Sequence, residues 1–443
     1  MKAKTLIILL DGVSSKDFFK LYNSGELPNI KSFFDGGFKI KNLVSTFPSE
    51  SQTCYPLIFC GIKLSETEEI AQMWYDRIKR QFIYLWDFFP IFRLHMKKEK
   101  HKSVFKGYGK ALTVGLKETK DAGTYIPPFY VICGLSLSKL GILVDTAVIR
   151  NTPYLFNRYD SIIFSIYSCD HLLHSYGYKG LLTSLKNLDK NLGYIINNKK
   201  LKDKLNIFIF SDHGNSPLKG KFEIQKVLKE NGYHLTRYLN EKKDVALVSN
   251  LLNYAFLYTK DNPENILKIL STYHQVGVVA YKNKKDNSVI ISNTNGRAKI
   301  FKDNEKICYK TENGDPLEYK NYFKEENFTD IRLTKNKWIE KTLDSRFPYA
   351  VVRLYEVFEN KNCGDIAISF DNGYCPNFSF TFNGRLKFTS RWPAFLYNHG
   401  GLERDQILSF LIANGEHIKS KKLKFAKLED LYSIFKNYFE DIK

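Results

Sequence analysis

Three short apolar runs in this chain end in carboxylate or imidazole side chains, which can bind metals or move protons. The residues are Asp11 after the run at 5–10, Asp170 and His174 after 161–167, and Asp212 and His213 after 206–210. Apolar runs of this length that stop at turn residues are typical of buried strands. Open α/β sheets place their sites at the carboxyl ends of such strands, so we expect these side chains to meet at one sheet edge.

The residue types and their spacing suit a metal site. Asp170 and His174 lie four residues apart, so they share a face if a helix begins there. His399, in a polar turn, adds a third well-placed imidazole. Three aspartates and three histidines suit two divalent ions about 3.5–4 Å apart, with zinc or manganese as the metal. For Asp212 and His213 alone, a turn followed by a helix cap is an equal alternative.

A serine lies where a strand is expected to turn into a helix. Pro48 ends the strand-like segment at 38–44, and a helix is expected to begin near Ser51, where hydroxyl side chains offer N-caps. A hydroxyl at a helix N-terminus faces the positive end of the helix dipole, which stabilises an alkoxide or a phosphoryl oxygen. Ser51 is therefore either a nucleophile or a plain N-cap, and its local sequence alone favours the cap.

The elements that would position these residues form an α/β pattern with two interruptions. Segments 1–230 and 346–443 alternate strand-like and helical stretches, which predicts one catalytic core. Within the core, residues 77–150 are less regular and aromatic, and we interpret them as an insertion that shapes a pocket. Residues 231–345 carry short alternating runs with Lys-Asn and Asn-Gly turns, which predicts an inserted α+β subdomain rich in strands.

Composition restricts the partners. The 443 residues carry a formal net charge of +20, mostly from lysines spread along the chain. Such a charge favours anionic ligands, and a solvated lysine surface is its simplest explanation. The alternative explanation is attraction of an anionic substrate or of a membrane face. Nucleic acid is not indicated, because no run alternates basic and aromatic residues as a single-strand groove would. The oligomeric state is left open.

The cysteines and the apolar runs bear on location. Seven cysteines without a CxxC pair indicate reduced thiols, which are typical of an intracellular protein. The apolar run near the N-terminus is too short for a signal peptide, and no run reaches the length of a transmembrane helix. We therefore expect a cytoplasmic protein without a transmembrane segment.

At this point the sequence resembles the alkaline phosphatase superfamily, and most closely its type I phosphodiesterase/nucleotide pyrophosphatase branch. The similar stretches occur in the family's order and are LLDG at 9–12, FPSES at 47–51, CG at 60–61, DHLLHSYG at 170–177, SDHG at 211–214 and HGGLERDQIL at 399–408. Each is short, but the ordered set is specific. The resemblance implies a three-layer sandwich around a mostly parallel sheet, with the β-rich subdomain inserted.

The resemblance also implies a role for each residue. Ser51 takes the place of the nucleophile and would form a phosphoserine intermediate. The ligands of the metal on the nucleophile's side would be Asp11, Asp212 and His213, with Ser51 itself. The second metal would be held by Asp170, His174 and His399. The implied protein is a two-metal phosphoric ester hydrolase that acts on diesters or pyrophosphates, with Zn²⁺ as the expected metal and Mn²⁺ as the alternative.

Departures from the family pattern keep other functions open. Nucleotide pyrophosphatases usually follow the nucleophile with Pro-Asn, where this chain has Thr53-Cys54. They also place a phosphate-contacting Asn shortly before a Tyr-Asp pair, and the nearest amide ahead of Tyr75-Asp76 in this chain is Gln72. A phosphomonoesterase, a phosphonate hydrolase and a phosphoryl transferase or mutase are the alternatives within this chemistry. The residues after Ser51 argue against a sulfatase.

The remaining alternative is a binding protein without catalysis, whose signature would be a lost ligand, and none of the seven matched positions is lost.

A diesterase also needs an apolar groove for its second ester group. Trp74, Tyr75 and Phe82 are the aromatic residues expected to supply it.

Overall fold

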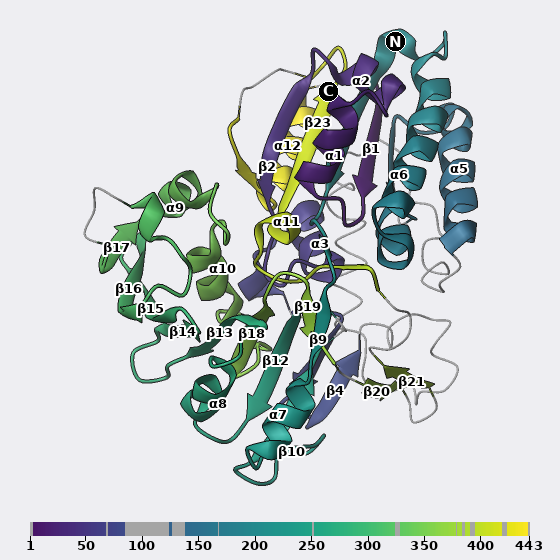
Figure 1. The fold of residues 1–443 in the computed structure, drawn as a ribbon. Helices are drawn as coiled ribbons and strands as arrows, with labels where there is room; N and C mark the ends of the chain where they lie inside the picture. The colour runs from purple at the N-terminus through teal and green to yellow at the C-terminus, as the bar shows by residue number, and fades with distance from the viewer. Residues whose placement is uncertain are drawn as a thin grey trace.

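The computed structural model describes residues 3–67, 70–84, 124–125, 138–166, 168–249, 252–323, 328–377, 379–382, 386–389, 395–418 and 423–441. These residues form two large sheets. The central sheet and its helices make one lobe, and the second sheet makes the other (Figure 1).

The central sheet has the strand order β24-β2-β23-β7-β1-β6-β5. Its strands are β1 (Lys4–Leu10), β2 (Phe38–Val44), β5 (Thr124–Tyr125), β6 (Ser161–Ile166), β7 (Leu205–Ser211), β23 (Leu408–Asn414) and β24 (Ala426–Lys427). β23 runs antiparallel to β2 and to β7, and the other pairs are parallel. β1 therefore lies between β6 and β7, and the carboxyl ends of these three strands meet at one edge.

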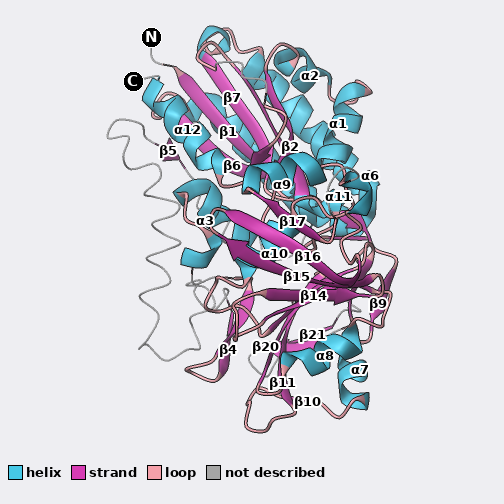
Figure 2. Ribbon diagram, turned by 90° about the vertical axis from the view of Figure 1, so that its left-hand side faces the viewer, coloured by secondary structure: helices cyan, strands magenta, loops and turns pink. Residues whose placement is uncertain are grey.

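Helices cover both faces of this sheet (Figure 2). One face carries α1 (Ser15–Asn23), α2 (Pro28–Phe34), α5 (Ser138–Leu155) and α6 (Ser168–Ile196), and the other carries α3 (Ser51–Cys60) and α12 (Asp430–Asp441). The alternation of β1 explains the two cores: Leu6 and Ile8 pack with the first group, whereas Ile7 and Leu9 pack with the second. The predicted three-layer sandwich with a mostly parallel sheet is confirmed.

The second sheet has the order β10-β11-β12-β18-β13-β14-β15-β16-β17 and is antiparallel except for the β10–β11 pair. Its strands are β10 (His234–Leu235), β11 (Asp244–Val248), β12 (Tyr254–Thr259), β13 (Val276–Lys282), β14 (Val289–Asn293), β15 (Gly296–Asp303), β16 (Lys306–Gly314), β17 (Asp330–Leu333) and β18 (Ile366–Phe370). The short alternating runs predicted within 231–345 therefore form strands, among them β13, β14 and β15. β18 pairs with β12 and β13, so this sheet extends past the 231–345 segment.

Shorter helices and strands complete the described fold. The helices are α7 (Ile224–Glu230), α8 (Pro263–Leu270), α9 (Lys335–Thr342), α10 (Ala350–Val357) and α11 (Arg404–Ile407). The short strands are β3 (Met73–Asp76), β4 (Gln81–Tyr84), β8 (Ser216–Pro217), β9 (Gly220–Phe222), β19 (Tyr374–Pro376), β20 (Ser379–Phe382), β21 (Leu386–Thr389) and β22 (Tyr397–Asn398). The division into a core and a 231–345 subdomain stays a prediction, and most of the 77–150 insertion lies outside the described residues.

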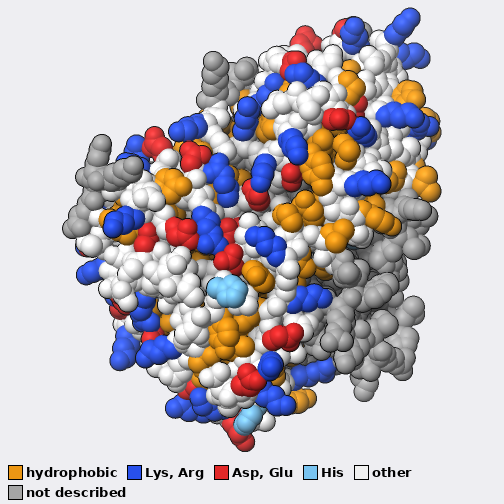
Figure 3. All heavy atoms as spheres, viewed as in Figure 1, with side chains coloured by type: hydrophobic (Ala, Val, Ile, Leu, Met, Phe, Trp, Pro, Cys, Tyr) orange, Lys and Arg blue, Asp and Glu red, His pale blue; other side chains and the backbone are white. Residues whose placement is uncertain are grey.

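The surface agrees with the composition. On the face in Figure 3, lysine and arginine side chains are spread out and interspersed with acidic ones rather than gathered in one patch. Among the described residues, no helix has both the length and the apolar character that crossing a membrane requires.

Candidate metal centre

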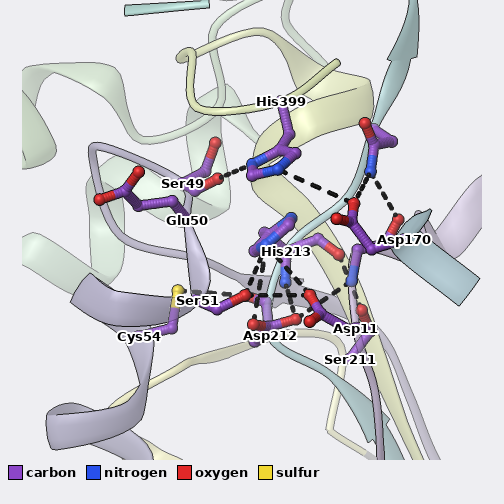
Figure 4. Close-up of polar contacts among 12 residues, drawn as sticks. Asp11, Ser49, Glu50, Ser51, Cys54, Asp170, Ser211, Asp212, His213 and His399 are labelled. Carbon is purple, nitrogen blue, oxygen red and sulfur yellow. Dashed lines mark hydrogen bonds and ion pairs between the residues drawn. The ribbon is translucent and has the colours of Figure 1, made fainter. Parts of the chain in front are cut away.

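Ser51 is the first residue of α3 and lies beside two of the predicted ligands (Figure 4). Its Oγ donates a hydrogen bond to Oδ1 of Asp11 at 2.9 Å and lies 3.3 Å from Nε2 of His213. The N-cap position belongs to Glu50, and no side chain caps this helix. The plain N-cap alternative for Ser51 is therefore wrong, because its hydroxyl is directed into the acidic site and not at the helix backbone.

The first group consists of Asp11, Asp212 and His213, at the ends of β1 and β7. These strands are parallel neighbours in which Leu10 pairs with Ser211, so the residues that follow each strand emerge side by side. Oδ1 of Asp212 accepts hydrogen bonds from the backbone N–H groups of Gly12 and His213, at 3.3 and 3.0 Å. Its Oδ2 is buried, accepts no hydrogen bond from the described residues and lies 3.7 Å from Nε2 of His213.

The second group consists of Asp170, His174 and His399. α6 begins at Ser168, so Asp170 and His174 share a helix face as their spacing predicted. Nε2 of His174 lies 3.1 Å from Oδ2 of Asp170, and Nε2 of His399 lies 3.8 Å from Oδ1 of Asp170. His399 follows β22 and reaches this group from a distant part of the sequence.

All three imidazoles are held in the same way. Nδ1 of His174 bonds the carbonyl of Tyr397 at 2.6 Å, and Nδ1 of His213 bonds that of Gly214 at 3.0 Å. Nδ1 of His399 bonds the carbonyl of Ser49 at 3.0 Å. Because a carbonyl only accepts, each Nδ1 carries the proton and each Nε2 faces the carboxylates. Protein metal sites orient histidine ligands by this kind of hydrogen bond.

Burial shifts the pKa values of the first group and of His399. Desolvation raises the pKa of Asp11 well above its ordinary value, and the Asp212 and Asp170 carboxylates raise it further. Burial also raises the pKa of Asp212 to about 6. Burial lowers the pKa of His213 to about 4 and that of His399 to about 3, so both imidazoles are neutral, and their rings stack at 4.1 Å.

Asp170 and His174 each favour the charged form of the other. Burial opposes the charge on each, but their mutual attraction and hydrogen bond hold the pKa of Asp170 well below its ordinary value and raise the pKa of His174. A divalent cation would compete with the proton on His174, because metal ligation requires the deprotonated nitrogen.

The donor set fits a divalent cation in each group. Within a group, the ligand atoms all lie within 4.8 Å of one another. Oδ2 of Asp212 is a buried oxygen without a hydrogen-bond donor, and the lone pair of the neutral His213 Nε2 faces oxygens of Asp11 and Asp212 at 3.6 and 3.7 Å. A cation between these atoms would satisfy both, and carboxylate with imidazole is a donor set of zinc and manganese sites.

Two residues of the site were not expected from the sequence. Asn215 donates from Nδ2 to Oδ1 of Asp170 at 2.9 Å and to the Gly12 carbonyl at 3.1 Å, so it links the two groups. Gly12 has φ +67°, and a Cβ there would lie 2.5 Å from Oδ1 of Asp170 and 2.7 Å from Nδ2 of Asn215. Gly12 is the last residue of the LLDG stretch and Asn215 directly follows SDHG, but the contacts exist only once the strands meet.

Replacement of Gly12 by alanine is expected to lower kcat by about 100-fold, because displacing Asp170 by about 1 Å misaligns the reacting groups. Gly25→Ala is the matched control: Gly25 has φ +81° but nothing within 4 Å of its Cβ position, so that variant reports backbone strain alone. Steady-state kinetics and melting temperatures of both variants check the prediction. Equal activity of the two variants would contradict it.

The expected aromatic groove is not formed as predicted. Trp74 and Tyr75 are 4% and 1% exposed and belong to the core beside the second sheet, so the expectation that they line a groove is wrong. Trp74 and Tyr75 are neighbours on β3 and point to opposite faces, and both are buried, so β3 is covered on both sides. Phe82 stays half-buried against Tyr75. Gln72 lies near the nucleophile and donates from Nε2 to the side chain of Gln52 at 3.1 Å.

A further group consists of His234 on β10, Asp244 on β11 and Glu241 in the connection between these strands. It shares no residue with the predicted set. His234 and Glu241 are exposed, and their ion pairs explain the grouping.

The chain is similar to known proteins in sequence pattern and in fold. A family model described as type I phosphodiesterase / nucleotide pyrophosphatase matches residues 5–375, a range that contains six of the seven predicted site residues, all but His399. Murine ectonucleotide pyrophosphatase / phosphodiesterase 5 has a similar solved structure, with a TM-score of 0.54, 14% identity, and coverage of 99% of this chain and 95% of that chain. At this identity the likeness shows the fold alone. No curated protein matches the sequence significantly.

Proposed function

The chain belongs to the type I phosphodiesterase/nucleotide pyrophosphatase family, and from this premise we propose that it hydrolyses phosphodiesters or pyrophosphates through a phosphoserine intermediate on Ser51. Membership makes it a hydrolase of phosphoric ester bonds in a metal-dependent family. The intermediate, the number and identity of the metals and the roles of individual residues are our proposals.

The observation that carries the proposal is the common orientation of the three imidazoles around Ser51 and three carboxylates. His174, His213 and His399 each donate from Nδ1 to a backbone carbonyl and direct Nε2 inward. Such preorganised ligands are what a two-metal phosphoryl-transfer site requires. A plain structural cluster would have no reason to orient all three rings alike.

We assign one divalent ion to each group, Zn²⁺ by preference and Mn²⁺ as the alternative. Asp11, Asp212 and His213 would hold the first with Ser51, and Asp170, His174 and His399 would hold the second. When bound, the two ions would supply positive charge that favours the serine alkoxide and neutralises the phosphoryl and leaving oxygens.

The residues of the chain then have defined tasks. Ser51 Oγ forms a bond to phosphorus while the bond to the leaving alkoxide breaks, which gives a phosphoserine that still carries the other ester group. Oδ1 of Asp11, 2.9 Å from Oγ, holds the hydroxyl proton and fixes the direction of the oxygen lone pairs. The N–H groups at the start of α3 stabilise the phosphoryl oxygens. Water cleaves the intermediate and restores Ser51.

The test combines metal analysis with turnover. We expect about two metal equivalents per chain and a kcat/KM for bis-p-nitrophenyl phosphate at least about tenfold above that for p-nitrophenyl phosphate, a difference of about 1.4 kcal/mol. Added alcohol acceptors distinguish a transferase, which would yield the new phosphate ester as its main product. A phosphonate monoester tests the phosphonate alternative.

Absence of both metal and ester hydrolysis would refute the proposal.

The substrate is proposed to be a small anionic phosphoester, and the cytoplasmic location stays a prediction from the cysteines.

A further inference from the structure

Glu50, the residue before the proposed nucleophile, has a fully buried carboxylate. Its Oε2 accepts a hydrogen bond from the hydroxyl of Tyr254 at 2.9 Å, and its Oε1 accepts one from the backbone N–H of Gln72 at 2.8 Å. A buried carboxylate is costly unless donors are directed at it, so the geometry of these donors fixes the position of Glu50. Because Ser51 is covalently next, its backbone position depends on the same contacts.

Tyr254 is the first residue of β12 and belongs to the second sheet, not to the catalytic one. The residue before it, Asn253, donates from its backbone N–H to the carbonyl of His399 at 2.7 Å. The ring of Tyr254 packs on Gly400, where an added Cβ would lie 2.7 Å from Cδ1 of the ring. Tyr254 therefore contacts the segment of the second ligand group as well as Glu50.

The two catalytic segments also meet directly. Nδ1 of His399 donates to the carbonyl of Ser49, and the backbone N–H of Gly400 donates to Oγ of Ser49 at 3.2 Å. Three segments therefore meet at one junction: 49–51, 253–254 and 399–400. The hydroxyl of Tyr254 bonds Glu50, which precedes the nucleophile, and the backbone N–H of Asn253 bonds the carbonyl of His399.

We propose that the Tyr254–Glu50 hydrogen bond is a positioning contact by which the second sheet holds Ser51 in register with His399. The inference rests on the proposed function of Ser51. In-line attack requires the nucleophile and the second ligand group to be placed within a fraction of an ångström, and a misplacement of about 1 Å can cost about 100-fold in rate. Tyr254 and Glu50 are positioning residues here, since they act through Ser51 and His399.

The test is Tyr254→Phe, which keeps the ring on Gly400 and removes only the hydroxyl. We expect kcat on bis-p-nitrophenyl phosphate to fall by about 10- to 100-fold, with KM and metal content within about twofold of the wild type. The matched control is Tyr258→Phe on the same strand, whose hydroxyl donates to the Asn362 carbonyl at 2.7 Å. We expect Tyr258→Phe to keep the wild-type kcat and to lose as much melting temperature as Tyr254→Phe.

Variants of Glu50 make the test independent of how well Tyr254→Phe folds. Glu50→Gln keeps an acceptor for Gln72 and an amide that can donate to the phenol oxygen, so it should retain kcat within about threefold. Glu50→Ala should lose kcat as Tyr254→Phe does, and the double variant Glu50→Ala/Tyr254→Phe should lose no more than Glu50→Ala alone, because both remove one interaction.

The outcomes separate this inference from the proposed function. If the wild type is active, either of two results would overturn the positioning role and leave the proposed function intact. One is an unchanged kcat in Tyr254→Phe, and the other is additive losses of kcat in the double variant. A wild type without ester hydrolysis would refute the proposed function, and the positioning role with it.

Discussion

Replacement of Ser51 by alanine is expected to lower kcat on bis-p-nitrophenyl phosphate by about 10⁴-fold or more, the loss typical of removing a covalent nucleophile. The hydroxyl is the side-chain atom of Ser51 that reaches Asp11 and His213. Without it, water would have to attack phosphorus directly, and water is not held where Oγ is. The measurement is steady-state turnover together with peptide mass analysis of acid-quenched enzyme, which should show the Ser51 peptide carrying a covalent p-nitrophenyl phosphate group in the wild type only.

The control for this variant is Ser271→Ala, at the C-cap of α8 in the second lobe, whose hydroxyl bonds the Lys268 carbonyl. It removes an equivalent hydroxyl far from the site and should leave kcat unchanged. Full turnover by Ser51→Ala would show that Ser51 is not the nucleophile. A phosphorylated peptide elsewhere in the chain would show the same.

Asp212→Asn is expected to remove about one of two metal equivalents and to lower kcat by about 10³-fold. The amide can keep the Oδ1 contacts with the N–H groups of Gly12 and His213, so the turn is preserved. What changes is Oδ2, the buried oxygen without a hydrogen-bond donor, which becomes an uncharged NH₂ group that cannot ligate a cation. Metal analysis and kinetics of the purified variant measure both effects.

Removal of metal from the wild type should also lower its stability. Ligand binding to the folded state stabilises it by about 4 kcal/mol when the free ligand is 1,000 times Kd, so a chelator should lower the melting temperature of the wild type more than that of Asp212→Asn. Asp35→Asn, at an exposed residue paired with Lys31, is the control and should respond to chelator as the wild type does. Equal metal content in Asp212→Asn and the wild type would exclude Asp212 as a ligand.

Much of the candidate site could be predicted from the sequence because its residues follow local patterns. Asp11 and Asp212 follow apolar strands, and parallel strands place their carboxyl ends at one edge, so a meeting at that edge was expected from the apolar runs. Their assignment to one ligand group depended on the family resemblance. Asp170 and His174 lie four residues apart, so a helix at this position is enough to place them on one face. His399 depended on the family resemblance, because a polar turn carries no information about which strand end it approaches.

The rest depended on contacts between distant segments. Asn215, Glu50 and Tyr254 are polar residues of ordinary surroundings in the sequence, and their importance comes from partners 45 to 204 positions away. The burial of Trp74 and Tyr75 is of the same kind, since a short strand does not reveal how many layers cover it. β18 reads as a buried strand, but its apolar residues give no sign that its neighbours are β12 and β13.

β23 has a consequence for the time course of synthesis. β2, which leads to Ser51, pairs only with β23 and β24 among the described strands, and its residue Val44 pairs with Leu408, 364 positions later. At translation rates of 5–20 residues per second, roughly 20–70 s separate the two strands on the ribosome. During that interval the strand before the nucleophile has no partner on either edge and is open to wrong pairing. The active site is therefore expected to be among the last parts of the molecule to form, because β1, β6 and β7 can pair before β23 is synthesised.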